Sequence, residues 1–401
     1  MELVHSSTLE KTAAKAPAGR PAALAFVTDA ESEAVLQGAF LEDSPGTIFR
    51  GNITKAVEHL TGARSPRILV VDISDVALPV TEVHHLADVC EPGVSVIVVG
   101  TRNEVGLYRD LLQAGVSEYI VKPLTPDLVA KALNTATHGV DAAPISRKLG
   151  KLIAFVGARG GVGTSTLAVN LAWYFAHQKA RRVGLLDLDL HNGVCSLMLN
   201  LPTSSGLRDA LENPSRVDSL FLERTMALHG ERLFVLGSQE PLDEELRFPA
   251  AAVDRLVEVL REQFHYVIVD VPRSPSPISR RVLEIADMRV IVVDQTLQAV
   301  RDAARLGRVP GLDGIERHDL IVVNRKGESG RRGVAVEEVG GALDHRLSCI
   351  VPFQPALFAA AGAKGIVPAE QKSHFADAIG RLATEISGQA IKRKPRWRLF
   401  R

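Results

Sequence analysis

The sequence predicts an α/β protein built from two doubly wound parallel-sheet domains. Short continuous apolar runs alternate with segments of helical spacing on both sides of a stretch of small residues, which is typical of strands covered on both faces. The chain has 401 residues, enough for two or three domains at about 150 residues each. Its hydrophobic fraction of 46% and charged fraction of 23% are those of a globular protein and exclude a disordered chain.

Composition divides the chain into five parts. Residues 1–20, rich in Ala, Lys and Ser, are predicted to be a flexible lead-in, and residues 138–149 are predicted to be a linker. The two domains are expected at residues 21–137 and 150–391. Residues 392–401 form a tail of basic and aromatic side chains.

In the first domain, four apolar runs are predicted to be strands. They lie at residues 22–28, 67–72, 95–99 and 118–121, and residues 32–40 have the spacing of a helix. The second domain repeats this alternation on a larger scale, and we expect at least six strands. Their runs lie at residues 152–156, 182–186, 233–236, 266–269, 289–293 and 320–323.

A glycine-rich segment joins the first strand of the second domain to a helical run. Glycines let backbone N–H groups approach an anion, and the helix N-terminus adds partial positive charge, so the segment is predicted to bind phosphate. The alternative is a tight structural turn. The pattern differs from G-x-x-x-x-G-K-[ST] by Thr164 at the lysine position. The predicted contacts are Gly157, Arg159, Gly160, Gly161, Val162, Gly163, Thr164, Ser165 and Thr166.

Three aspartates lie where predicted parallel strands end. Asp187, Asp189 and Asp270 follow or close apolar runs, and open α/β sheets place their ligand crevice at that edge. Mg²⁺ takes hard oxygen ligands and keeps several waters, so Ser165 with one or two carboxylates would suffice to hold it. A helix N-cap is the alternative role for any one of these aspartates.

The segment R-G-G-V-G-x-S-T resembles the deviant phosphate loop of the ParA/MinD ATPases. That resemblance implies ATP and Mg²⁺ as cofactors and an ATP-bridged homodimer in which Arg159 reaches the partner's phosphates. It further implies that Asp189 orients the attacking water, so that Asp189 is the catalytic candidate. Ser165, Asp187 and Asp270 are the implied metal residues, and Asn324 with Arg325 is associated with the adenine base.

Two positions depart from the family pattern. Thr164 replaces the phosphate-contacting lysine, and Ser274 stands where the family's D-x-P-x-G switch has glycine. Losing a preorganised cation from phosphoryl transfer costs several kcal/mol of transition-state stabilisation. We therefore expect ATP binding with slow or absent hydrolysis, that is, at most a weak ATPase.

The first domain resembles a response-regulator receiver, which has a flavodoxin-like fold. Asp72 ends an apolar run at the phosphoacceptor position, Thr101 stands at the switch-hydroxyl position, and Lys122 belongs to an A-G-x-x-x-Y-x-x-K-P passage. Only one acid, Asp29, occupies the place of the receiver's acidic pair. We therefore prefer a receiver-shaped interaction or dimerisation domain over a phosphorylated one, with Asp72 as the phosphoacceptor candidate.

The order of a receiver-like domain and a ParA/MinD-like domain with an altered loop resembles the CpaE/TadZ pilus-assembly proteins. This resemblance spans roughly residues 22–368. It implies a cytoplasmic organiser of the Flp/Tad pilus machinery, with machinery proteins as partners, placed at a pole or peripherally at the inner membrane. The alternatives are a DNA or cargo partitioning ATPase, and a phosphorelay output protein controlled through Asp72.

Charge and cysteine content limit which partners and which cellular compartment are expected. Forty-seven basic and 47 acidic residues balance, so no specific nucleic-acid partner is expected. Cys90, Cys195 and Cys349 are far apart without a CxxC pair, which predicts a reducing compartment and no metal site. No signal-peptide core or membrane-spanning apolar run is found in the sequence, which favours a soluble protein.

The tail suggests a surface contact. Six basic residues are interleaved with Trp397, Leu399 and Phe400 within residues 392–401, a composition suited to an anionic membrane surface. Nucleic-acid phosphates would also suit it, and a solvated terminus is the simplest alternative.

Overall fold

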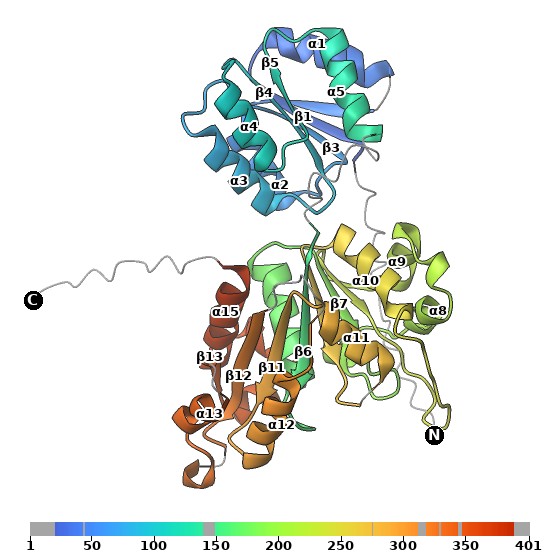
Figure 1. Ribbon diagram of the computed structural model, residues 1–401, viewed down its shortest axis with the longest axis vertical. Coiled ribbons are helices and arrows are strands. Elements are labelled where there is room, and N and C mark those ends of the chain that lie inside the picture. The colour runs from blue at the N-terminus through green and yellow to red at the C-terminus, as the bar shows by residue number, and fades with distance from the viewer. Residues whose placement is uncertain are drawn as a thin grey trace, which may run out of the picture.

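The computed structural model describes residues 21–42, 45–138, 149–274, 276–311, 318–328, 330–343 and 347–388. The chain forms two α/β domains, each with its own sheet (Figure 1). The predicted lead-in, the tail at residues 392–401 and linker residues 139–148 lie outside the described residues.

The first domain is a five-stranded parallel sheet in the order β2-β1-β3-β4-β5. Helices α1 and α5 cover one face, and α2, α3 and α4 cover the other. Its strands are β1 (Ala23–Val27), β2 (Gly46–Arg50), β3 (Ile68–Asp72), β4 (Ser95–Gly100) and β5 (Glu118–Val121). Its helices are α1 (Ala30–Glu42), α2 (Ile53–Gly62), α3 (Pro79–Val89), α4 (Val105–Gln113) and α5 (Pro126–His138).

The four strands expected in this domain are all present, because each is a run of apolar residues buried between two helical layers. The central strands β1 and β3 are buried at every residue. Strand β2 was not predicted. It lies at the sheet edge and is exposed or half-buried throughout, so it lacks the continuous apolar pattern of its neighbours.

The second domain is an eight-stranded sheet in the order β13-β12-β11-β6-β10-β7-β9-β8. Helices α8 to α13 pack on one face, and α6, α7, α14 and α15 on the other. Its strands are β6 (Lys151–Gly157), β7 (Val183–Asp187), β8 (Ala227–His229), β9 (Leu233–Leu236), β10 (Tyr266–Val271), β11 (Met288–Val293), β12 (His318–Lys326) and β13 (Leu347–Pro352).

The helices of this domain connect its parallel strands in the doubly wound manner. A π-helical turn at Tyr174–Gln178 continues α6. The helices are α6 (Thr164–Trp173), α7 (Cys195–Met198), α8 (Gly206–Glu212), α9 (Ser219–Thr225), α10 (Ala252–Gln263), α11 (Pro277–Ile285), α12 (Leu297–Gly307), α13 (Val336–Leu343), α14 (Pro355–Lys364) and α15 (His374–Ser387).

Two strands go beyond the six predicted, and both lie at sheet edges. Strand β8 has three half-buried residues and pairs antiparallel with β9, so the sheet is not parallel throughout. Strand β13 extends the other edge beside β12. Edge strands meet a partner on one side only, and short ones carry too little apolar pattern to be recognised in sequence.

The two domains meet at the amino-terminal edges of their sheets. Glu91, which precedes β4, lies 3.6 Å from Arg182, which precedes β7. Arg64, which precedes β3, is also 3.6 Å from Glu91. Arg232, which precedes β9, donates a 3.0 Å hydrogen bond to the Thr61 carbonyl at the end of α2. The carboxyl edges of the two sheets therefore face away from each other.

Candidate nucleotide and metal site

The glycine-rich segment crosses the carboxyl edge of the second sheet between β6 and α6. Gly163 precedes the helix with a φ of 94°, a left-handed conformation that favours glycine. No side chain caps this helix, so the N–H groups of its first turn are available to an anion. A Cβ at Gly157 would lie 2.4 Å from the Thr164 hydroxyl, so glycine is required where the loop begins.

Asn324, at the end of β12, holds this loop in place. Its Nδ2 donates a 2.8 Å hydrogen bond to the Val162 carbonyl, and its Oδ1 accepts one of 2.9 Å from the Arg325 backbone. A Cβ at Gly163 would lie 2.4 Å from the same Nδ2. The sequence resemblance associates Asn324 with the adenine base, and the structure shows that its amide also positions the phosphate loop.

Asp187 and Asp270 lie side by side at this edge. Strand β10 lies between β6 and β7, and the register pairs Asp270 with Asp187. Both side chains are buried. Burial, followed by the charge of Asp187, raises the pKa of Asp270 to about 7, although Ser165 donates a hydrogen bond to it. Burial likewise raises the pKa of Asp187.

Asp189 stands at the rim of this group and is half-buried. Its backbone N–H donates a 3.2 Å hydrogen bond to Asp187, and its carboxylate accepts one of 2.9 Å from the Asn192 backbone. These bonds form a turn that keeps Asp187 and Asp189 on the same edge as the phosphate loop.

The donor set fits a magnesium ion beside a phosphate. The Ser165 hydroxyl and the Asp187 and Asp270 carboxylates offer hard oxygen atoms, and they lie next to the open N-terminus of α6. A divalent cation would also relieve the cost of burying two neighbouring carboxylates. The site can therefore hold a nucleotide phosphate and its metal together.

Arg159 is held by contacts within the chain. Its guanidinium makes a close ion pair with Asp294, which follows β11, and donates a 3.0 Å hydrogen bond to the Gly160 carbonyl. Asp294 is buried and also accepts a 2.7 Å hydrogen bond from Thr296. Sequence reasoning missed Asp294, because 135 residues separate it from Arg159 and it belongs to no motif.

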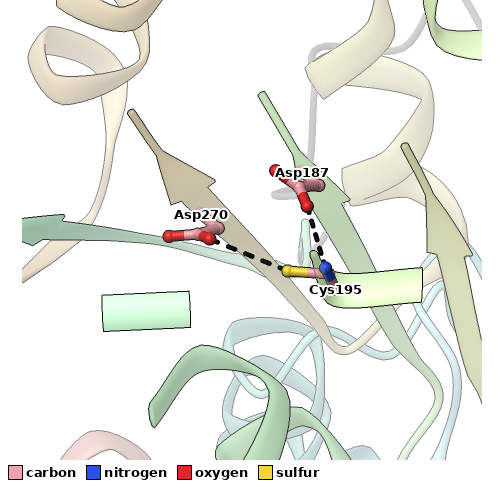
Figure 2. A group of neighbouring side chains, drawn as sticks. All are labelled: Asp187, Cys195 and Asp270. Carbon is pink, nitrogen blue, oxygen red and sulfur yellow. Dashed lines mark hydrogen bonds between the residues drawn. The ribbon is translucent and has the colours of Figure 1, made fainter. Parts of the chain in front are cut away.

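Cys195 joins the two buried carboxylates (Figure 2). Its Sγ lies 3.7 Å from Asp270 Oδ2, and its backbone N–H donates a 3.0 Å hydrogen bond to Asp187 Oδ2. The expectation that the cysteines offer no metal site rested on sequence spacing alone. The fold brings Cys195, Asp187 and Asp270 close enough to hold a metal ion together.

The carboxyl edge of the first sheet carries a separate polar cluster around Asp72. Asp72 is fully buried and accepts hydrogen bonds from the hydroxyls of Thr28 (2.7 Å) and Ser74 (2.5 Å). Lys122 Nζ lies 2.5 Å from both Asp72 and Asp29. Burial raises the pKa of Asp72, but the bonds from Lys122, Ser74 and Thr28 outweigh it and lower this pKa. The carboxylate thus has several internal partners.

A family model matches part of the second domain. The family model described as "Cellulose biosynthesis protein BcsQ" matches residues 150–325. The septum site-determining protein MinD of Bacillus subtilis is 23% identical over 248 residues, which cover 61% of this chain and 91% of that protein.

Solved structures establish the fold. A ParA family ATPase from Chlorobium tepidum has a TM-score of 0.53 and is 22% identical, covering 59% of this chain and 98% of that one. MinD complexed with Mg-ADP from Pyrococcus horikoshii has a TM-score of 0.50 and is 21% identical, covering 59% and 96%. The pilus assembly protein CpaE from Caulobacter crescentus is 31% identical with a TM-score of 0.28, covering 29% and 98%.

No helix in the described part of the chain has the length and apolar content to cross a bilayer.

Proposed function

We propose that this chain, whose second domain is similar to the ParA/MinD ATPases, binds ATP and Mg²⁺ and works as a nucleotide-dependent homodimer. The observation that carries this proposal is the uncapped N-terminus of α6 beside Ser165, Asp187 and Asp270. Phosphate oxygens would accept hydrogen bonds from the first-turn N–H groups. Ser165 and Asp270 would hold the metal, in keeping with the Mg-ADP of the Pyrococcus horikoshii relative.

The homodimer is supported by the rim of the same sheet edge. Large apolar side chains in the segments that follow β7, β9 and β11 are exposed there, among them Leu197 (77%), Leu242 (78%) and Leu297 (78%). We propose that these side chains form part of an interaction surface. A second copy facing this edge would cover it, and Arg159, released from Asp294, would reach the phosphates bound by the partner.

Turnover is proposed to be slow. In the P-loop pattern a lysine contacts the β- and γ-phosphates, and Thr164 offers only a short, uncharged hydroxyl at that position. Asp189 would still orient water. The bound nucleotide would therefore persist and act as an assembly signal, and little of it would be consumed.

We propose further that the assembled dimer organises the Flp/Tad-type pilus machinery in the cytoplasm. The support is the CpaE/TadZ-like order of a receiver-like domain and a ParA/MinD-like domain with Thr164 in the loop. Peripheral contact of residues 392–401 with an anionic membrane belongs to this proposal. Liposome flotation of the chain with and without those residues tests it, and identical flotation would remove the membrane contact.

A second candidate is a partitioning ATPase that positions DNA or another cargo. The MinD relatives, whose name describes septum site determination, favour a positioning role as well. The two candidates differ in their partner. Hydrolysis stimulated by duplex DNA would support partitioning, whereas loss of pili on deletion of the protein, with no DNA effect, would support the pilus role.

Control through phosphorylation of Asp72 is the third alternative, and the geometry weighs against it. Asp72 is fully buried and already bonded to Thr28, Ser74 and Lys122. The cluster around Asp72 lies on the carboxyl edge that faces away from the second domain. We expect acetyl phosphate to leave the intact mass of the protein unchanged. A phosphoryl adduct that Asp72→Ala abolishes would reverse this view.

The central experiment is the solution mass by light scattering without nucleotide, with MgADP and with MgATP. We expect a dimer that forms or tightens with MgATP, and Arg159→Ala should weaken it. Arg247→Ala is a matched control, because Arg247 is an exposed arginine whose ion pair within the described residues is with nearby Glu245. If the solution mass is the same with and without nucleotide and no ATP is retained, the proposal is overturned. The protein would then be described as a scaffold.

A further inference from the structure

Cys195 places a sulfur atom within a group of buried oxygen ligands. It is the first residue of α7 and is completely buried, as Asp187 and Asp270 nearly are. One possible ligand atom from each residue can be chosen so that all three lie within 4.8 Å of one another. Figure 2 shows the three side chains converging from β7, β10 and the start of α7.

The surrounding backbone holds these groups in place. The Cys195 N–H donates to Asp187 Oδ2, so the residue that carries the sulfur also orients one carboxylate. A Cβ at Gly193 would lie 2.7 Å from Asp187 Oδ2, so glycine lets the chain pass close beside that oxygen. The register of β7 with β10 sets Asp270 next to Asp187.

The spacing suits a tetrahedral cation. With metal–sulfur bonds of about 2.3 Å and metal–oxygen bonds of about 2.0–2.2 Å, sulfur and oxygen ligands stand about 3.5 Å apart. The observed separation of Cys195 Sγ and Asp270 Oδ2 is 3.7 Å. Mg²⁺ takes oxygen ligands in octahedral geometry and gains nothing from a thiolate, whereas Zn²⁺ and Cd²⁺ do.

We infer that Asp187, Cys195 and Asp270 form a binding site for a thiophilic divalent cation of the Zn²⁺ class, with a fourth position open to water. On binding, the S–H bond breaks, the proton leaves to solvent and a sulfur–metal bond forms, without electron transfer. Because two of the three ligands belong to the proposed magnesium site, the thiophilic cation and Mg²⁺ compete. Zn²⁺ would thus block the metal-dependent use of nucleotide.

Titration of the reduced, chelator-treated full chain with Cd²⁺ alone tests this site. No nucleotide is present, so the result does not depend on the proposed ATP binding. We expect the ultraviolet thiolate-to-cadmium absorption band to rise to one equivalent. Cys195→Ser should abolish it, and Asp187→Asn should weaken Cd²⁺ binding at least tenfold.

Cys349→Ser is the matched control, because Cys349 is another buried cysteine whose thiol contacts the Ala378 carbonyl. This variant should keep the full band. A band that survives in Cys195→Ser, or that is lost in Cys349→Ser, overturns the assignment.

Cadmium NMR of the unsubstituted protein reports the ligand type directly. Its result does not depend on whether a variant folds. One sulfur among oxygen ligands gives a resonance between those of all-oxygen and multi-sulfur sites. An all-oxygen or multi-sulfur resonance contradicts the site.

Discussion

At the residue scale, the proposed slow turnover rests on the side chain at position 164. We predict that Thr164→Lys raises ATP turnover at least about tenfold, because a preorganised donor at developing charge is worth about 10²–10³ in kcat. Phosphate release at saturating MgATP measures it. Thr164→Ser keeps a hydroxyl without a charge and should leave turnover near that of the original protein. An unchanged rate in Thr164→Lys would contradict the role given to this position.

His265 couples stability to pH at the domain junction. Burial, followed by the charge of Arg181, lowers its pKa from 6.5 to about 3, and its Nδ1 accepts a 3.2 Å hydrogen bond from the Arg182 N–H. Between these values the unfolded chain binds a proton that the folded chain excludes, so stability falls as pH drops below 6.5.

The size of the stability loss follows from how far the pH lies below 6.5, the pKa of His265 in the unfolded chain. At pH 5 this residue should lower the free energy of unfolding by about 2 kcal/mol relative to neutral pH, at 1.36 kcal/mol per pKa unit. Urea unfolding at both pH values measures the loss, and His265→Gln should reduce it by that amount. An equal pH dependence in the two proteins would show that His265 is not excluded from protonation.

At the scale of elements, the end of β12 supports the phosphate loop through Asn324. Replacing Asn324 by Ala removes the donor to the Val162 carbonyl, at a cost of about 1–3 kcal/mol for a buried group left unpaired. We predict a comparable loss of stability and about tenfold weaker binding of a fluorescent ATP analogue, because the loop loses its anchor.

The matched control for Asn324 is Asn213, which is exposed at the end of α8. Asn213→Ala should change neither stability nor nucleotide affinity. If Asn324→Ala binds the nucleotide as tightly as the original protein, the loop is held by other contacts.

At the scale of the whole molecule, Glu91 joins the two domains. It is 6% exposed and lies 3.6 Å from both Arg64 and Arg182. Removing one member of a buried ion pair costs about 3–5 kcal/mol. We predict that Glu91→Gln separates the domains and increases the radius of gyration in small-angle X-ray scattering.

Glu223 offers the comparison, because it lies 4.0 Å from the same Arg64 but is 39% exposed. An exposed pair contributes about 0–1 kcal/mol, so Glu223→Gln should leave the domains docked. Equal scattering from the Glu91→Gln variant and the original protein would show that other contacts hold the junction.

Local pattern was enough to predict most of the fold. Each buried strand is a short apolar run between helical segments, so the ten predicted runs all correspond to strands. The glycine-rich loop between β6 and α6 could also be recognised in the sequence, because its tight turn requires glycines at fixed positions. The edge strands β2, β8 and β13 were not predicted, because strands that are only partly buried do not require a continuous run of apolar residues.

The chemistry of the candidate site depends on contacts between distant residues. Strand-end position alone placed Asp187 and Asp270 at one sheet edge. Only the strand order and register made them neighbours, added Cys195 from 75 residues away and paired Arg159 with Asp294. Hydrophobic periodicity shows which face of a helix or strand is buried. Which side chains lie opposite that face depends on how the whole chain packs. The sequence therefore predicted a candidate phosphate site, and the tertiary structure decided which side chains lie beside it and that Arg159 pairs with Asp294.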